Sequence, residues 1–264
     1  MTACVKAADV VRAGAANLTG VRWEVKGPAD FVSDVDRAAE AALRAVIAER
    51  HADAVVIAEE GSPTAVASAL TFVADPLDGT TNFLHGFPWY AVSIAAVVNG
   101  SQVAAAVLNV ANGDLFTAVV GSGARRNGQP VRVSEITDPS RALIGTGFPF
   151  KHREGIAPYM DILPRLMAQT AGLRRAGSAA LDLCDVACGR FDAFWELRLA
   201  PWDVAAGILI IREAGGVVTD LAGNAAPVAH GPIVAGNPAM QAWLLKELRT
   251  ADDGWGTAVP ERRH

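Results

Sequence analysis

The sequence contains few cysteines, and none has the spacing of a redox or metal-binding motif. The three are Cys4, Cys184 and Cys188, and no two of them form a Cys-x-x-Cys pair. Cys184 and Cys188 lie one helical turn apart, where small buried thiols are the simpler explanation. Unpaired cysteines are typical of a reducing compartment, so we expect a cytoplasmic protein.

Long apolar runs and basic stripes are also missing. No run approaches the ~18 apolar residues that a membrane-spanning helix needs, and Lys6, Asp9 and Arg12 interrupt the N-terminal segment. The formal net charge is −5, which argues against a nucleic-acid-binding surface. We therefore expect no membrane partner and no nucleic-acid partner.

Aromatic residues are scarce at 6% of the chain, whereas apolar residues together reach 51%. Alanine, valine, leucine and isoleucine must therefore build most of the core. A chain of 264 residues can bury a substantial core, either as one large domain or as two tightly joined halves.

Helix and strand patterns alternate along the chain without internal repeats. They predict helices at about 3–17, 34–50, 152–169, 177–189, 203–214 and 238–250, the last capped by Asn237. They predict strands at about 54–58, 70–75, 90–98, 102–110, 113–119, 141–146, 191–197, 216–220 and 232–236. Asn99-Gly100 and Asn112-Gly113 indicate hairpin turns, and hence an antiparallel meander in the middle of the chain. The pattern predicts an α/β protein built in layers.

The segment over residues 75–83, D-P-L-D-G-T-T-N-F, concentrates oxygen ligands at the end of a predicted buried strand. The strand delivers Asp75, and Pro76 limits the local backbone and helps to turn the Leu77 carbonyl outward. Asp78 follows three residues after Asp75. Mg²⁺ prefers such an all-oxygen set and usually combines a few carboxylates with substrate phosphate and water.

The second part of the same segment predicts a phosphate contact. Gly79 allows close backbone approach, and residues 80–82 supply capping side chains for a following helical turn. The unpaired N–H groups of that turn are suited to phosphate oxygens. An ordinary Asp-Gly turn is the alternative, and D-x-x-D-G alone would favour it. The full string of nine residues is much more specific.

This string resembles the signature of the inositol monophosphatase family, the Mg²⁺-dependent, lithium-sensitive phosphatases. Two further segments resemble family elements in the same order, namely A-E-E-G at 58–61 and P-W-D-V-A-A-G at 201–207 with its continuation R-E-A-G-G at 212–216. Ala58 stands where the family often has glycine, which leaves the ligands intact. The resemblance extends from about Lys26 to Asn237.

The resemblance implies a five-layer αβαβα sandwich that is commonly a homodimer. We expect a single domain over 1–264, with the metal-binding motif in an N-terminal half of about 1–140 and substrate-binding residues in a C-terminal half of about 141–250. Residues 251–264 are predicted to form a mobile tail.

The resemblance also implies a set of metal ligands. Glu59, Asp75 and the Leu77 carbonyl would hold a first Mg²⁺, and Asp75, Asp78 and Asp203 would hold a second. Part of the family has a third, weaker ion near Glu59. Four carboxylates and a phosphate dianion sum to about −6, which three divalent ions would neutralise and two would not. Whether two or three ions are needed stays open. Taken alone, Asp203 would be an ordinary acid at a helix N-terminus.

The expected chemistry is direct hydrolysis by metal-activated water, without a phosphoenzyme. The resemblance implies that Glu59 orients or deprotonates the water, and that Thr80, hydrogen-bonded to Asp36, completes the activating group. Asp36 belongs to the segment 26–36, which resembles the family pattern K-x-P-x-D-x-V-[ST]-x-x-D. A surface helix acid is the alternative for Asp36, and Asp34 is expected to be scaffold.

The predicted substrate contacts are Asp78, Gly79, Thr80, Gly177, Ser178, Ala179, Glu196 and Asp203. The small residues at 177–179 open a predicted helix and let a sugar or cyclitol ring approach the backbone. Glu196 matches a family position that accepts hydrogen bonds from inositol hydroxyls, and an exposed strand-end glutamate is its alternative.

The expected reaction is hydrolysis of myo-inositol 1-phosphate, a small phosphorylated cyclitol. Related enzymes that act on fructose bisphosphate, histidinol phosphate or adenosine bisphosphate are the alternative. A second phosphate would require cations, for which the candidates are Lys151, His152, Arg153, Arg174 and Arg175. Arg174 and Arg175 could instead contact a dimer partner or surface acids. A further alternative is an interaction protein of transcription complexes that keeps the phosphatase fold.

Overall fold

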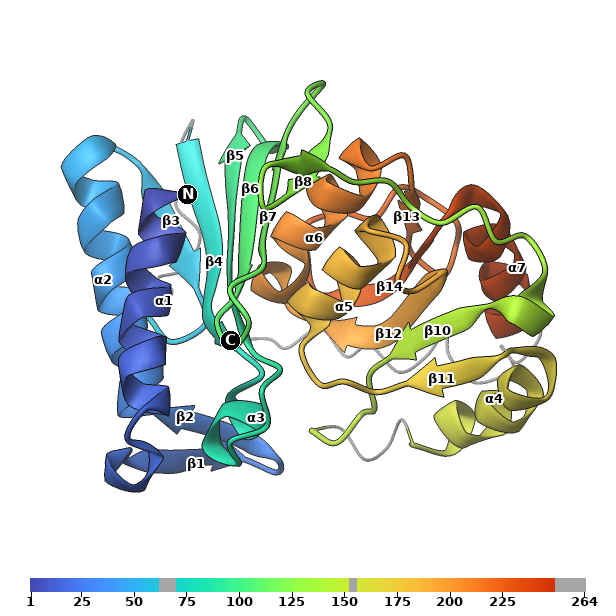
Figure 1. Cartoon of the computed structure of the whole chain (residues 1–264), viewed down its shortest axis with the longest axis horizontal. Helices are drawn as coiled ribbons and strands as arrows, with labels where there is room; N and C mark the ends of the chain where they lie inside the picture. Colours follow the sequence, from blue (N-terminus) through green and yellow to red (C-terminus); the bar gives the residue numbers. More distant parts are fainter. Residues whose placement is uncertain (62–69, 152–155, 250–264) are drawn as a thin grey trace.

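Two large sheets and three layers of helices alternate in the order αβαβα (Figure 1). The structure, a computed structural model, describes residues 1–61, 70–151 and 156–249. The predicted five-layer fold is therefore confirmed. The predicted helix start at 152–155 and the predicted tail 251–264 lie outside the described residues.

The first two layers come from the N-terminal half of the chain. Helices α1 (Thr2–Ala15) and α2 (Asp34–Arg50) pack on one face of a seven-stranded sheet of order β3-β4-β5-β6-β7-β8-β9. Its strands are β3 (Val55–Ala58), β4 (Leu70–Asp78), β5 (Ala91–Val98), β6 (Ser101–Asn109), β7 (Leu115–Val119), β8 (Ala124–Arg126) and β9 (Gln129–Pro130). Asn99 and Gly100 both have positive φ in the β5–β6 turn, as the Asn-Gly pair predicts.

The other three layers come mainly from the C-terminal half. Helices α5 (Ala179–Ala187) and α6 (Pro201–Glu213) lie between the sheets, and α4 (Ile156–Gln169) and α7 (Pro238–Arg249) form the outer layer. The second sheet has the order β11-β10-β12-β14-β13. Its strands are β10 (Leu143–Thr146), β11 (Gly172–Arg174), β12 (Ala193–Leu199), β13 (Val217–Thr219) and β14 (Gly231–Gly236). Asn237 caps α7 by accepting from the Met240 N–H at 3.0 Å, as predicted.

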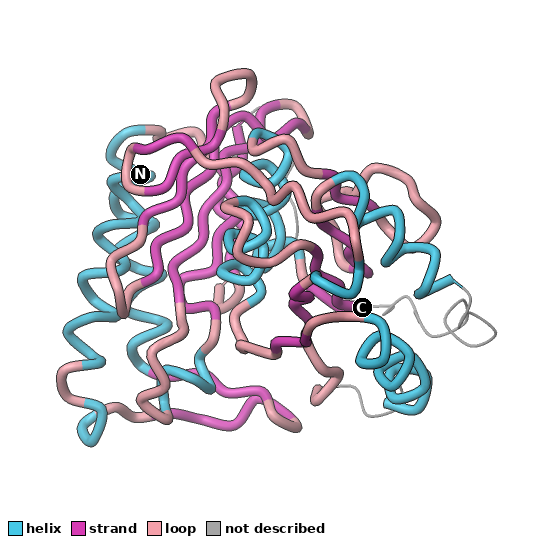
Figure 2. The backbone as a smooth tube through the Cα atoms, turned by 45° about the vertical axis from the view of Figure 1, so that its right-hand side comes forward, coloured by secondary structure: helices cyan, strands magenta, loops and turns pink. Residues whose placement is uncertain are grey.

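Several short elements were not predicted from the sequence. A hairpin of β1 (Trp23–Gly27) and β2 (Asp30–Ser33) extends along one end of the large sheet, at the bottom of the view in Figure 2. The first four positions of β1 are exposed, so the strand lacks the apolar alternation that identifies a strand in sequence. The short helix α3 (Thr80–Leu84) lies where a helical turn was predicted after Gly79. Strands β8, β9 and β11 were also missed, because two or three residues give too short a pattern.

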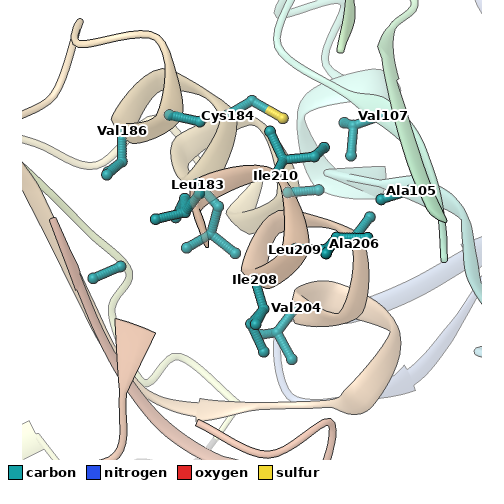
Figure 3. Packing of buried hydrophobic residues seen from close by; sticks show 14 of the residues in the cluster. Ala105, Val107, Leu183, Cys184, Val186, Val204, Ala206, Ile208, Leu209 and Ile210 are labelled. Carbon is teal, nitrogen blue, oxygen red and sulfur yellow. The ribbon is translucent and has the colours of Figure 1, made fainter. Parts of the chain in front are cut away.

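The central helices pack tightly enough to require glycine at one contact. Figure 3 shows α6 residues such as Ala206 and Ile210 near Ala105 and Val107 of β6, with α5 on the other side. A Cβ atom on Gly207 of α6 would lie 2.5 Å from a methyl carbon of Leu183 on α5, so only glycine fits. This close packing fixes α5 and α6, whose N-terminal ends carry predicted site residues.

The described helices and cysteines agree with two expectations from composition. No described helix is long and apolar enough to cross a membrane. Cys4 and Cys184 are buried free thiols, and Cys188 is a half-buried one. The cysteines therefore pack as small apolar side chains, and burial raises the pKa of Cys4 to about 12.

Candidate active site

A cavity of about 410 Å³ lies where the two halves of the chain meet. Its described lining comes from the β1–β2 hairpin, the ends of β3 and β4, the segment after β10, the first turns of α5 and α6, and β12. All but one of the predicted site residues line it, and these are Glu59, Asp75, Leu77, Asp78, Gly79, Thr80, Gly177, Ser178, Ala179, Glu196 and Asp203. The exception is Asp36, which is buried behind Thr80.

The end of β4 presents two of the acids. The pairing of β4 with β5 shifts register between Asp75 and Asp78, which accommodates Pro76 in the strand. The strand therefore runs to Asp78 and does not end at 75 as predicted. The Asp75 carboxylate accepts a hydrogen bond from the Leu77 N–H at 2.9 Å, and the Leu77 carbonyl accepts one from the Thr80 hydroxyl at 3.0 Å.

The capping side chains predicted for the next turn have other partners. Gly79 has φ +90° and precedes α3, which has no side-chain cap. The Thr80 hydroxyl instead lies 2.9 Å from the carboxylate of Asp36, the hydrogen bond that the family resemblance implied. Asp36 is buried at the start of α2 and also accepts from the backbone N–H of Ser33 at 2.9 Å. Burial raises the pKa of Asp36, against the hydrogen bonds from Ser33 and Thr80 that lower it.

Asp78 joins the first half of the chain to helix α5. One carboxylate oxygen accepts from the Ser178 hydroxyl at 2.6 Å and from the Ala180 N–H at 2.8 Å. Two groups of the α5 N-terminus therefore hold Asp78, contacts that the sequence did not predict. Asp203 lies in the first turn of α6 and accepts from the Ala200 N–H at 2.7 Å.

The acids of the cavity repel one another. Burial and the charges of Glu59, Asp78 and Asp203 raise the pKa of Asp75 well above its usual value. Burial, Asp78 and Glu59 do the same for Asp203, and burial raises the pKa of Asp78 to about 6 despite its hydrogen bonds. A cation bound among these carboxylates would relieve their repulsion.

Three ion pairs hold the turn of the β1–β2 hairpin at the cavity. The Lys26 ammonium lies 3.3 Å from Glu59 and 2.7 Å from Glu60, and these acids raise the pKa of Lys26 although burial alone would lower it. Across the same turn, Asp30 at the start of β2 lies 2.6 Å from Lys151, which follows β10. The Asp30–Lys151 pair joins the two halves of the chain, and both residues line the cavity.

Glu196 of β12, in the second sheet, also lines the cavity. Burial raises the pKa of Glu196 to about 8, against the lowering effect of Arg175. Arg175 lies over the ring of Phe150 at 5.0 Å and lines the cavity. Arg174 is exposed, is not part of the lining and donates to the Leu173 carbonyl. His152 and Arg153 lie outside the described residues.

Other lining residues were missed in the sequence. Asp30, Phe31 and Tyr159 line the cavity, and so does Asp182 on α5. Asp182 is 2% exposed, and one of its carboxylate oxygens has no hydrogen-bond partner in the described part of the chain. Burial and the charges of Asp78 and Glu196 raise its pKa well above the usual value. The D-L-C-D sequence around it resembles a core helix, so no local pattern separates Asp182 from scaffold.

The donor atoms of the cavity fit Mg²⁺ by type. The acids and the Leu77 carbonyl offer only oxygen, and the described lining contains no histidine or cysteine. Within the described ranges, no group of three or more acidic, histidine or cysteine side chains converges closely enough to hold an ion. The acids share one cavity and raise each other's pKa, so the fit rests on donor chemistry and charge.

A layered αβαβα fold with acids gathered between its halves defines a class of phosphatases. The chain belongs to the inositol monophosphatase family, whose sequence profile matches residues 1–253. It is 45% identical over 242 residues to a putative Nus factor SuhB of Neisseria meningitidis serogroup B, covering 91% of this chain and 93% of that protein. It is 47% identical over 214 residues to an inositol-1-monophosphatase of Rhizobium meliloti, covering 81% and 80%.

Solved structures show the same fold. The extragenic suppressor protein suhB of Bartonella henselae matches with a TM-score of 0.90 and 41% identity, over 94% of this chain and 96% of that one. An IMPase of Thermotoga maritima matches with a TM-score of 0.86 and 30% identity, over 95% of both chains. The predicted family is therefore confirmed, and with it a phosphatase fold whose members are generally Mg²⁺-dependent.

Proposed function

We propose that this protein hydrolyses a phosphate monoester with Mg²⁺, and that myo-inositol 1-phosphate is its main substrate. The observation that carries the proposal is the cavity lined by Asp75 and Asp78 of β4, by Glu59 after β3 and by Asp203 of α6, together with Glu196 of β12 in the other sheet. The group of acids from β4, α6 and the end of β3 suits a metal-bound phosphate, and the separate carboxylate of β12 suits ring hydroxyls. The name of the Rhizobium meliloti relative supports the same substrate.

The residues of this chain would act in three groups. Glu59, Asp75, the Leu77 carbonyl, Asp78 and Asp203 would hold two or three Mg²⁺, which supply an activated water and neutralise charge on the phosphate. Glu59 would accept the proton of the attacking water at its free carboxylate oxygen. The Thr80 hydroxyl, held by Asp36, would orient that water. The backbone at Gly79 and Thr80 would contact the phosphate.

The ring of the substrate would lie against the start of α5. Gly177 and Ala179 present little side chain to the cavity, and Ser178 is already engaged with Asp78. Glu196 would accept hydrogen bonds from ring hydroxyls. Lys151 is paired with Asp30, and Arg175 is placed over Phe150. These contacts favour a single phosphate over a bisphosphate, whose second group would need unengaged cations.

A kinetic panel tests the substrate. The purified protein with Mg²⁺ should give its highest kcat/KM with inositol 1-phosphate, compared with fructose bisphosphate, histidinol phosphate and adenosine bisphosphate. If inositol 1-phosphate ranks last, the substrate assignment is wrong. If no phosphomonoester is hydrolysed, the phosphatase proposal itself fails.

Substituting Gly147 with alanine should weaken binding of the polyol. An added Cβ would clash with the carboxylate of Glu196 and displace it from the cavity wall. We expect kcat/KM for inositol 1-phosphate to fall by about 10–100-fold, the effect of one lost charged hydrogen bond. Gly145→Ala is the matched control, because its Cβ would clash with Phe191 in the core instead. Equal kinetic losses in both variants would contradict the role of Glu196.

The pH dependence of substrate binding should report on Glu196. Its carboxyl has a pKa of about 8, so it loses its proton as the pH rises through that value. Because an ionised carboxylate accepts stronger hydrogen bonds, KM for inositol 1-phosphate should fall between pH 7 and 9. The same pH series with p-nitrophenyl phosphate, which has no ring hydroxyls, shows how much of the change in KM comes from other titrating groups. The step should be missing in Glu196→Gln, and a step that persists there would assign it to another group.

We also propose that the protein is a homodimer that pairs through α4. Ile156, Met160 and Met167 are 40%, 54% and 67% exposed and follow helical spacing on this outer helix. Met160→Glu combined with Met167→Glu should halve the mass measured by light scattering. Val119→Glu, at an exposed apolar site on β7, should leave the mass unchanged. A monomeric wild type would contradict the proposal.

A second candidate function is a role as a Nus factor in transcription complexes in the cytoplasm. It is favoured by the names of several relatives, including the Neisseria meningitidis protein at 45% identity. The acids of the cavity are all present in this chain, so we place such a role beside catalysis. Purified protein that fails to hydrolyse any phosphomonoester with Mg²⁺ would make the interaction role the main one.

A further inference from the structure

The side chain of Asn82 connects the two halves of the chain beside the cavity. Its amide nitrogen donates to the carbonyl of Trp89 at 2.7 Å and to the carbonyl of Ala176 at 3.0 Å, 94 residues away. Both partners are acceptors, so only the NH₂ group of Asn82 can serve them and the orientation of the amide is fixed. Both amide hydrogens are therefore committed, one to each half.

Two glycine turns meet at this connection. Gly79 and Gly177 both have positive φ, at +90° and +97°. A Cβ on Gly79 would lie 3.0 Å from the Trp89 carbonyl oxygen and 3.3 Å from that of Gly177. A Cβ on Gly177 would lie 3.0 Å from the amide nitrogen of Asn82. The backbones thus approach as closely as they can only because both positions are glycine, and Asn82 fills the remaining space.

The hydrogen bonds of Asp78 cross the same boundary. Asp78 accepts from the Ser178 hydroxyl and the Ala180 N–H, the residues that follow Gly177. Three hydrogen bonds therefore join the segments 78–82 and 176–180, namely Asn82 to Ala176, Ser178 to Asp78 and Ala180 to Asp78. The close approach of Gly79 and Gly177 adds a fourth contact. We call this pair of segments the cross-half seam. Asn82 belongs to the seam but is not part of the cavity lining.

We propose that Asn82 is a positioning residue that sets the distance between the phosphate-binding turn and the start of α5. This inference rests on the proposed function, in which the phosphate lies at 78–80 and the ring lies at 177–179 and Glu196. A substrate that contacts both sides of the seam requires a fixed distance between them, since a small misplacement of reacting groups costs much of the rate. A substrate that binds through its phosphate alone does not.

The chain offers a matched control in Asn237. Its amide nitrogen also donates two hydrogen bonds, to the Ser134 hydroxyl and the Ile136 carbonyl, both at 2.9 Å. Asn237 is buried at the start of α7 in the outer layer and does not line the cavity. Loss of its two bonds should lower stability as loss of those of Asn82 does, without a change in substrate preference.

The test compares Asn82→Asp with Asn237→Asp. Aspartate keeps the shape of asparagine but places an oxygen where the NH₂ group donated. We would measure kcat/KM for inositol 1-phosphate and p-nitrophenyl phosphate, the midpoint of thermal unfolding, and hydrogen exchange at the Ala180 amide. For Asn82→Asp, the ratio of the two kcat/KM values should fall about tenfold or more and the Ala180 amide should exchange faster. Both readouts should stay at the wild-type level in Asn237→Asp.

The outcomes separate this inference from the proposed function. An unchanged ratio and unchanged exchange in a folded Asn82→Asp protein would overturn the positioning role. If the wild type hydrolyses neither substrate, the proposed function fails, and the exchange at Ala180 alone then decides whether Asn82 holds the seam. Should Asn82→Asp fail to fold, Asn82→Ser, which keeps one short donor, provides the same measurements.

Discussion

Replacement of Asp75 by asparagine is expected to lower kcat by about 10²–10³-fold, the usual effect of removing one electrostatic stabiliser from an active site. The same change should raise the thermal stability of the metal-free protein. Burial and the charges of Glu59, Asp78 and Asp203 hold the pKa of Asp75 well above its usual value. The asparagine oxygen can still accept from the Leu77 N–H, so the local turn is preserved.

The sign of the stability effect follows from proton linkage. A carboxyl whose pKa is higher in the folded than in the unfolded state, where it is about 3.9, loses stability on ionising as pH rises. The advantage of Asp75→Asn should therefore be absent below about pH 4 and should grow toward neutral pH. Thermal unfolding in EDTA over this range measures it. A variant that is less stable than the wild type at pH 7 would show that the repulsion is not the dominant effect.

Asp192 provides the contrasting buried acid. Its two carboxylate oxygens accept from the Ser134 hydroxyl at 2.5 Å and from the Leu143 N–H at 2.7 Å, away from the cavity. An asparagine that keeps its oxygen toward the Leu143 N–H would turn its NH₂ group toward Ser134, whose hydroxyl hydrogen would then lose its acceptor. Asp192→Asn should therefore lose about 1–3 kcal/mol of stability while the turnover of the folded fraction stays unchanged. Opposite stability changes at two buried aspartates would identify Asp75 as a functional group.

Removal of Mg²⁺ is the second change with a large expected effect. Turnover should fall to the background rate in EDTA and return when Mg²⁺ is added in excess. A cation that binds only the folded state at 100 times its Kd stabilises it by about 2.7 kcal/mol, or about 5–10 °C in Tm for a protein of this size. The acids that now repel each other would account for the gain.

The comparison of wild type and Asp75→Asn controls for non-specific salt effects. The Mg²⁺-induced rise in Tm should be small in the variant, because it lacks a central acid of the cavity. Turnover that persists in EDTA would refute metal dependence. An equal rise in both proteins would place the bound ion elsewhere.

Much of the layered fold could be predicted from the sequence, because long elements carry clear periodic patterns. The helix over 34–50 and the strands that flank Asn99-Gly100 lie where expected. The hairpin of β1 and β2 was missed because β1 is exposed and lacks apolar alternation, and because part of its contacts are ion pairs with residues remote in sequence, such as Glu60 and Lys151. The pattern of apolar residues along the sequence does not identify which charged residues will form ion pairs.

The same limit applies to the site. The order of the acidic motifs predicted that Glu59, Asp75, Asp78 and Asp203 would share one cavity, and the structure places them there. It could not predict the contact of Asp78 with Ala180 or of Asn82 with Ala176, because each joins residues about 100 positions apart. Their roles as ligands and catalytic groups remain predictions for the experiments above.

The distribution of the cavity residues over both halves has a consequence for synthesis on the ribosome. Glu59, the first of the four acids, and Asp203, the last, are separated by more than half of the chain. Helix α6 must leave the ribosome before Asp203 can join the other acids. A nascent polypeptide that ends before α6 contains every strand of the seven-stranded sheet but lacks Asp203, so it cannot be an active phosphatase. The rate at which activity returns during refolding would therefore report the rate at which the two halves dock. We expect docking to be a late step, because it depends on contacts between residues far apart in sequence.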